Sequence, residues 1–249
     1  MRAWLTSLLL IVSSSTFAAS DYAREKRWAD EVTPGIVVGD PVYLEQKNHH
    51  KFLGIYTEAA NAKMGLVVVH GVGIHPDWGL IGTLRQRLPD HGYTTLSIQM
   101  PIRAADAKPE SYASTFPEAV EGLQLAVTYL KEKGYQRIAL VSHSMGSRMS
   151  HHYMARNPTD VHAWVALSIP ATLGKPGTAM TYGGIKVPVL DLYGDSDLQQ
   201  VLAGAAKRKA SLKNNAASKQ IVVPDSDHFF ANHEDAMLKA VKDFLDALD

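Results

Sequence analysis

The stretch LVSHSMGSRM, residues 140–149, decides the fold of this chain. An apolar run ends at Ser144, and a helical pattern begins directly after it. Small residues, Ser142 and Gly146, stand on either side of the serine at a distance of two positions. A turn tight enough to push the Ser144 hydroxyl out above a sheet brings both flanking positions close to neighbouring backbone, so both must be small. The stretch therefore predicts a strand, a sharp turn that exposes Ser144 as a nucleophile, and a helix. A simpler alternative is that Ser144 only caps the helix.

Strand-like and helix-like segments alternate on both sides of this stretch. Short apolar runs of the strand type occupy residues 65–71, 93–101, 137–143, 161–170, 187–194 and 219–224. Stretches of helical character occupy residues 78–91, 117–133, 145–157, 198–213 and 232–248. Each parallel crossover needs a connection of helix length, so the alternation predicts an α/β fold with a mainly parallel sheet and helices on both faces. Residues 41–46 and 51–58 flank the polar turn KNHH and predict an antiparallel N-terminal hairpin.

Composition and charge limit the possible functions. The chain has 249 residues, of which 46% are hydrophobic and 20% charged. That is enough for one substantial core, and we expect a single domain over residues 20–249. Lysine plus arginine equals aspartate plus glutamate, at 25 each. No whole-molecule field then favours nucleic acid or an anionic membrane, and neither is expected as a partner.

The first residues, MRAWLTSLLLIVSSSTFAAS, have the layout of a secretory signal peptide. Arg2 precedes a short apolar stretch, and small residues end at Ala18 and Ala19. The apolar stretch is about half as long as the roughly 20 residues that a spanning helix needs, which disfavours a stable membrane anchor. The chain has no cysteine, so it contains neither a disulfide nor a lipidated cysteine. We expect residues 1–19 to be a signal peptide and the protein to be periplasmic or secreted in a bacterium.

From about Gly65 to the C-terminus, the strands, the serine turn and the following helix resemble the α/β-hydrolase superfamily. The superfamily pattern is usually Gly-x-Ser-x-Gly. Ser142 replaces the first glycine here, which keeps a small side chain but makes the motif less specific. Residues 73–101 also resemble an uncharacterised exported bacterial branch of the superfamily, which indicates no substrate. The resemblance implies a Ser-His-Asp triad whose members follow along the chain as serine, acid and histidine.

An acid is expected on the turn after a later strand. Asp197 lies three residues past Gly194, the Gly-x-x-Asp spacing common in the superfamily, and is the preferred triad acid. Asp195 is the competitor, and Asp191 falls inside the predicted strand. A structural alternative is a capping box in which Ser196 caps the next helix and Asp197 complements its dipole.

The histidine is expected between the last strand and the last helix. His228, followed by two aromatic residues, is the preferred base, and His233 is expected in the first turn of the final helix. Residues 70–73 form His-Gly-Val-Gly, which resembles the oxyanion loop of the superfamily. By that resemblance the backbone amides of Val72 and Met145 would donate to the developing oxyanion, and His70 would serve as a structural residue beneath the loop.

No metal or cofactor is expected. None of the eleven histidines falls in a His-x-x-x-His arrangement with a carboxylate between, and the third glycine of a dinucleotide loop is absent after Gly73. Residues 101–119 are expected to form a long loop that helps to shape the pocket. Residues 171–185 are too short and too rich in glycine for a multi-helix cap. We expect a fairly open, mostly apolar pocket near Val72, Met145 and the loops around Ile102 and Met180.

Two classes of function fit these features. The first is a serine hydrolase that cleaves carboxylic esters or related acyl compounds through an acyl-enzyme, with a small-molecule acyl substrate. Carboxylesterase is the first choice, and thioesterase, peptidase and acyltransferase activities use the same residues. The alternative is a non-catalytic exported protein of the same fold that serves as a binding or assembly factor. The sequence leaves the oligomeric state open.

We predict that the first 18 or 19 residues are removed on export, because small residues at Ala18 and Ala19 close the leader pattern. Mass spectrometry of the N-terminus, on protein taken from fractionated cells, checks this. An intact Met1 on cytoplasmic protein would contradict the prediction.

Overall fold

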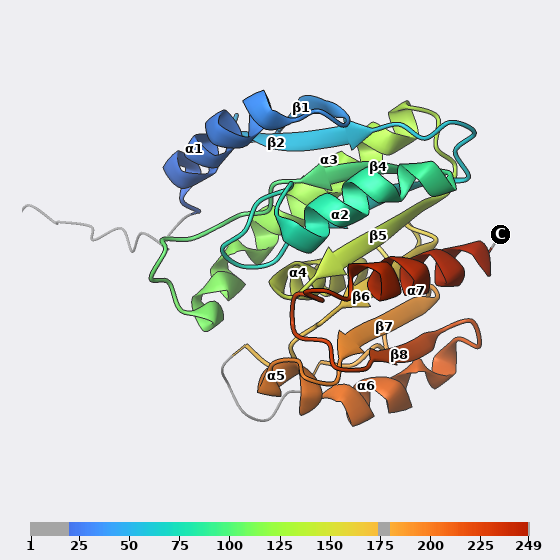
Figure 1. Cartoon of the computed structure of the whole chain (residues 1–249). Coiled ribbons are helices and arrows are strands. Elements are labelled where there is room, and N and C mark those ends of the chain that lie inside the picture. The colour runs from blue at the N-terminus through green and yellow to red at the C-terminus, as the bar shows by residue number, and fades with distance from the viewer. Residues whose placement is uncertain (1–19, 174–179, 249) are drawn as a thin grey trace, which may run out of the picture.

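One eight-stranded sheet forms the centre of the molecule, with strand order β1-β2-β4-β3-β5-β6-β7-β8 (Figure 1). The computed structural model describes residues 20–173 and 180–248. The strands are β1 (Asp40–Glu45), β2 (Lys51–Thr57), β3 (Met64–Val69), β4 (Tyr93–Ile98), β5 (Ile138–His143), β6 (Ala163–Leu167), β7 (Val189–Gly194) and β8 (Lys219–Val223). β2 runs antiparallel to β1 and to β4, and the pairs from β4 to β8 are parallel. The prediction of a mainly parallel sheet with an antiparallel N-terminal hairpin is confirmed.

The central strands are buried along their whole length because helices cover both faces of the sheet. Every residue of β3, β4, β5, β6 and β7 is buried. A parallel strand covered on both faces is expected to be a continuous apolar run rather than an alternating one. β1 lies at the edge and has one buried residue, Leu44. The apolar runs in the sequence therefore reflect two-sided burial.

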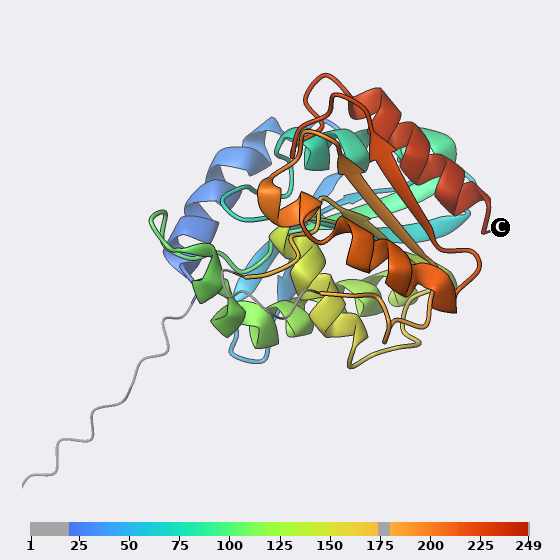
Figure 2. The ribbon, with the colours of Figure 1, turned by 90° about the horizontal axis from the view of Figure 1, so that it is seen from below.

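Helices form a layer on each face of the sheet. Figure 2 shows the sheet between α2 and α7 above it and α3, α4 and α6 below it. The α-helices are α1 (Tyr22–Val32), α2 (Gly79–Arg87), α3 (Phe116–Glu132), α4 (Met145–Met154), α5 (Gln199–Leu202), α6 (Ala205–Ser211) and α7 (Glu234–Asp246). The 3-10 helices are η1 (Thr33–Gly35), η2 (Pro89–His91), η3 (Pro109–Thr115) and η4 (Leu212–Asn214). Each of the five predicted helical stretches overlaps at least one of these helices.

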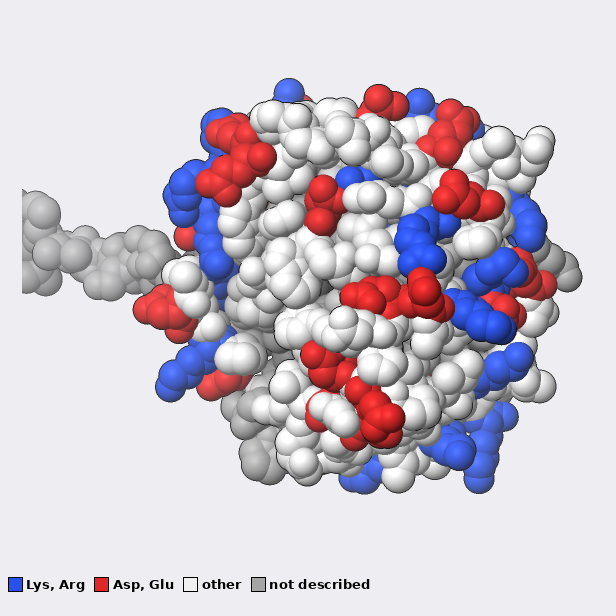
Figure 3. Space-filling model, in the orientation of Figure 1, with Lys and Arg blue, Asp and Glu red and all other residues white. Residues whose placement is uncertain are grey.

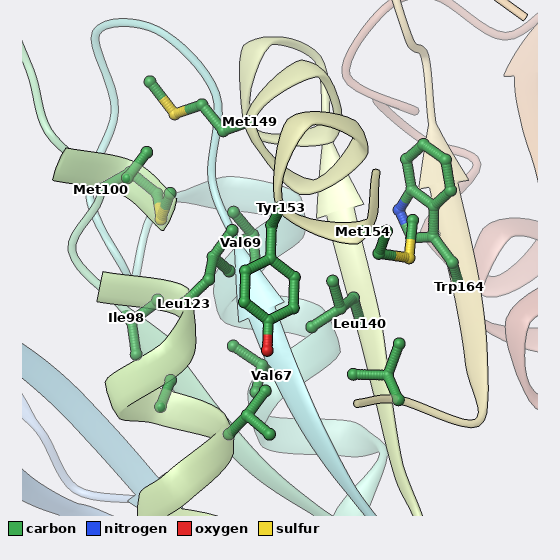
Figure 4. Packing of buried hydrophobic residues seen from close by; sticks show 14 of the residues in the cluster. Val67, Val69, Ile98, Met100, Leu123, Leu140, Met149, Tyr153, Met154 and Trp164 are labelled. Atoms are coloured by element: carbon green, nitrogen blue, oxygen red, sulfur yellow. The ribbon is translucent and has the colours of Figure 1, made fainter. Parts of the chain in front are cut away.

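An apolar cluster between the sheet and helices α3 and α4 packs α4 against the sheet (Figure 4). Tyr153 of α4 is fully buried and packs among Leu123 of α3, Val67 of β3 and Leu140 of β5. Burying a side chain of this size contributes about 1.5–3 kcal/mol. Because α4 begins directly after Ser144, this packing also positions the serine turn.

Helix α1 was not anticipated from the sequence. Asp21 caps it, since the Asp21 carboxylate accepts a hydrogen bond from the Arg24 amide at 2.9 Å. The helix packs through Ala29 on Leu53 and Ile55 of β2. Its mean hydropathy is low, and Glu25 and Ala29 are its buried residues, so few apolar residues mark this helix in the sequence.

The predicted loop over residues 101–119 needs a correction, and the predicted signal peptide lies outside the described residues. The predicted long loop over residues 101–119 contains η3 and the first turn of α3, so only its first half is irregular. The expected signal peptide, residues 1–19, lies outside the described residues.

The surface carries charges of both signs. Basic and acidic side chains both occur across the face shown in Figure 3, in keeping with the net charge of zero. Within residues 20–173 and 180–248, no helix is both long enough and apolar enough to span a bilayer.

Candidate active site

Ser144 sits on a strained turn between β5 and α4. Its φ of 54° and ψ of −121° lie outside the region that a serine prefers, and such a residue costs on the order of 1–3 kcal/mol. The turn is held because the Ser144 amide donates to the Leu167 carbonyl at 2.9 Å. Ser144 occupies the N-cap position of α4, but its hydroxyl makes no capping hydrogen bond. The structure therefore does not support the simpler alternative of a capping serine.

The turn requires glycine at position 146 because the backbone of the neighbouring strand end lies against it. A Cβ atom on Gly146 would overlap the carbonyl oxygen of His70. Ser142 is tolerated in place of the usual glycine because its hydroxyl makes two hydrogen bonds. The Ser142 Oγ accepts a hydrogen bond from the Trp164 indole at 2.7 Å and donates to the Val165 carbonyl at 3.3 Å.

His228 links Ser144 to Asp197, in the order predicted from the sequence. Its Nε2 lies 3.0 Å from the Ser144 Oγ, and its Nδ1 lies 2.6 Å from an Asp197 carboxylate oxygen. With a carboxylate oxygen as the acceptor, Nδ1–H donates to Asp197 and Nε2 is left to accept the serine proton. Ser144, His228 and Asp197 come from three turns that follow β5, β8 and β7, and parallel strands bring these turns to the same edge.

Asp197, and not Asp195, faces the histidine. The Asp197 side chain is fully buried and also accepts a hydrogen bond from the Leu198 amide at 2.6 Å. Asp195 is exposed, with the Ser196 hydroxyl 3.1 Å away. Gly194 makes this possible, since a Cβ there would overlap the Ser226 carbonyl of the histidine loop. The capping-box alternative is not observed, because no side chain caps α5.

The remaining predicted acids and bases are placed elsewhere. Asp191 is buried in β7 and pairs with Arg208 at 3.0 Å, which makes it a structural residue. His233 is the N-cap residue of α7 and does not reach Ser144.

His70 holds the loop that carries Val72. Its Nδ1 lies 2.8 Å from the Gly71 carbonyl and must donate, while its Nε2 accepts from the Met100 amide at 2.8 Å. Burial holds the pKa of His70 down at about 4, so the ring is neutral at pH 7. A trans peptide is planar, so the Val72 amide points away from the Gly71 carbonyl that His70 holds. His70 is a structural residue, as expected.

His143 is a buried residue at the site that the sequence analysis passed over. It ends β5, directly before Ser144, and its Nε2 lies 2.9 Å from the His228 carbonyl. Burial, reinforced by the nearby His228, lowers the pKa of His143 to about 3. The sequence signal was a titratable residue at the end of a mainly apolar strand.

A cavity of about 430 Å³ opens at Ser144. Its apolar lining residues are Val72, Pro109, Met145, Pro170, Leu173, Leu198 and Phe229. Among the described residues that line the cavity, Glu110 is the one carboxylate, and there is no lysine or arginine. Ile102 and Met180, whose loops were expected here, are themselves buried in the core, and neighbouring residues of the same loops line the cavity instead.

Two other hollows formed by described residues lie away from Ser144, Asp197 and His228. One of about 470 Å³ lies between α1 and the N-terminal hairpin, and one of about 720 Å³ lies beside the hairpin turn and α3. Among the described residues, no group of three or more His, Asp or Glu side chains is arranged to hold a metal ion.

Comparison with known proteins supports the fold and leaves the activity open. Residues 40–121 match a family model described as a protein of unknown function, DUF3530. This match spans less than half of the chain. No curated protein matches the sequence.

Solved structures with the same fold are α/β hydrolases. Est1E from Butyrivibrio proteoclasticus is 17% identical, with a TM-score of 0.64 over 84% of this chain and 98% of that one. XC6422 from Xanthomonas campestris, described as a serine hydrolase without a lid, is 13% identical, with a TM-score of 0.66 over 85% and 95%. Dienelactone hydrolase from Anabaena variabilis is 16% identical, with a TM-score of 0.67 over 82% and 96%. At these identities the likeness shows an α/β-hydrolase fold.

Proposed function

We propose that this protein is a serine hydrolase that cleaves carboxylic esters or related acyl compounds through an acyl-enzyme on Ser144. The observation that carries the proposal is the continuous hydrogen-bond path from the Ser144 hydroxyl through His228 to the buried carboxylate of Asp197. The α/β-hydrolase fold, whose solved examples include a serine hydrolase and an esterase, supports the same class of reaction.

The chemistry follows from the direction of these hydrogen bonds. As the Ser144 Oγ attacks an acyl carbonyl, His228 Nε2 takes the hydroxyl proton and then gives it to the leaving alcohol. Asp197 keeps the other ring proton on Nδ1 and stabilises the imidazolium that forms between these two transfers. A water molecule, deprotonated by the same nitrogen, then attacks the acyl-enzyme and restores the Ser144 hydroxyl.

In this proposal the backbone amides of Val72 and Met145 donate hydrogen bonds to the former carbonyl oxygen as it becomes negatively charged. Met145 is the first residue of α4, where the helix dipole favours negative charge. Val72 lines the same cavity, and its amide points away from the carbonyl that His70 holds. Neither amide has a hydrogen-bond acceptor within the described part of the chain, so both are free to donate to an oxyanion.

Replacing Ser144 by alanine is expected to abolish covalent labelling by a fluorescent organophosphonate and hydrolysis of p-nitrophenyl butyrate, because the attacking oxygen is removed. Gel fluorescence and absorbance of released nitrophenol measure the two effects, and circular dichroism checks that the variant is folded. Labelling retained at another residue would reject Ser144. A folded wild-type protein that neither labels nor turns over would favour the non-catalytic binding or assembly factor.

The acid is tested by a matched pair of variants. Asp197→Asn is expected to lower kcat by about 10⁴-fold, as loss of the triad acid does elsewhere, because the imidazole loses its orienting acceptor. Asp195→Asn removes the same charge two residues away on an exposed side chain and is expected to change kcat by less than about threefold. Steady-state kinetics of both variants decide between them, and a larger loss at Asp195 would reverse the assignment.

The substrate is expected to be a soluble ester with a modest, uncharged acyl group, because the described part of the cavity wall is mainly apolar. In a series of p-nitrophenyl esters, kcat/KM is expected to be highest for short chains. Rates measured below and above the solubility limit of the longer esters serve as the control for interfacial activation. A preference for long chains, with a jump in rate once aggregates form, would contradict this substrate class.

A further inference from the structure

We infer that His143 is a positioning residue, which holds the backbone of His228 against the end of β5 so that the imidazole stays within reach of Ser144. This inference rests on the proposed function, since it concerns the proton transfer between Ser144 and His228. It assigns a role to a buried histidine that the proton relay itself does not use.

The position of the ring proton on His143 follows from its partner. A carbonyl oxygen can only accept, so the His143 Nε2 must carry the proton and donate to the His228 carbonyl at 2.9 Å. Nδ1 then bears the lone pair, and it has no hydrogen-bond partner among the described residues. The ring also packs 4.8 Å from the His228 ring and 5.6 Å from the Phe229 ring, measured between centroids.

The ring stays uncharged while His228 gains and loses its proton. Burial is the main reason that the pKa of His143 lies far below 7, and the charge of a protonated His228 lowers it further. His143 therefore does not compete with His228 for the serine proton. Its contribution is one donated hydrogen bond at a fixed place.

The loop that carries His228 depends on this bond. The amides of Phe229 and Ala231 both donate to the Asp227 carboxylate, at 2.9 Å and 3.0 Å, which closes the turn on itself. Within the described residues, the His228 carbonyl has the His143 side chain as its partner and no other. The bond thus ties the base to β5, the strand that leads directly into the nucleophile.

Glutamine and methionine form a matched pair of replacements for His143. The amide nitrogen of glutamine is separated from Cα by the same number of bonds as the histidine Nε2 and can donate to the same carbonyl. Methionine has a side chain of the same length without a donor. A misplaced catalytic group costs about 10²-fold in rate, so His143→Met is expected to lower kcat by that factor with KM changed less than about twofold. His143→Gln is expected to stay within about threefold of wild type, because it keeps the hydrogen bond.

Phosphonate labelling rates and steady-state kinetics of the two variants test the inference, with thermal unfolding to confirm that both are folded. Asparagine supplies a second variant if His143→Met does not fold. Its amide reaches only the idle Nδ1 position, so His143→Asn is expected to lose activity although it remains polar. Equal losses in the glutamine and methionine variants would overturn the inference, as would a methionine variant with wild-type kcat.

A readout that does not need turnover separates this inference from the proposed function. The hydrogen-bonded Nδ1 proton between His228 and Asp197 gives a far-downfield proton resonance, assigned by its absence in His228→Gln. That resonance is expected to persist in His143→Gln and to shift or broaden in His143→Met. If wild-type protein turned over no ester, the proposed function would fail, and this resonance would still decide whether His143 positions His228. An unchanged resonance in His143→Met would overturn the inference.

Discussion

The close contact between Gly146 and the carbonyl oxygen of His70 is the constraint on which the site depends. It brings the first turn of α4 against the end of β3 with no room for a side chain between them. The left-handed backbone at Ser144 persists because this contact, the buried face of α4 and the bond to the Leu167 carbonyl all hold it. A strained residue survives only where its surroundings determine it from several sides. The packing of α4 and Gly146 against the sheet therefore holds Ser144 at the end of β5 with its hydroxyl exposed to the cavity.

Much of this arrangement could be predicted from residues that the chemistry of a tight turn demands. The strands were recognisable because two-sided burial leaves continuous apolar runs, and Gly146 and Gly194 stand where the backbone of one turn lies against another segment. The order of Ser144, Asp197 and His228 was also predictable. Asp197 was preferred over Asp195 only on the Gly-x-x-Asp spacing of the superfamily that the chain resembles. Which of these two carboxylates the loop turns inward is seen in the folded chain.

Other features depend on long-range packing and left little trace in the sequence. Helix α1 has a narrow apolar face, and Ala29 is its one buried apolar residue. The role of His143 depends on a carbonyl 85 residues further along the chain. The loops around Ile102 and Met180 were expected beside the pocket and contribute to its wall, whereas Ile102 and Met180 themselves turn into the core. The side chain of a loop residue can face either way from the same backbone path. The local sequence pattern predicts most helices and strands, whereas the long-range contacts between them are seen only in the folded chain.

The site is assembled from segments that the ribosome makes far apart in time. Ser144 and His228 are 84 residues apart, and the loop of His228 follows β8, the strand that pairs only with β7 at the edge of the sheet. Under the proposed function, Ser144 has no base until β8 joins the sheet, so a partly folded chain would not react with esters. Covalent labelling of Ser144 would then report only the molecules in which β8 has joined the sheet, and none of the folding intermediates before that step.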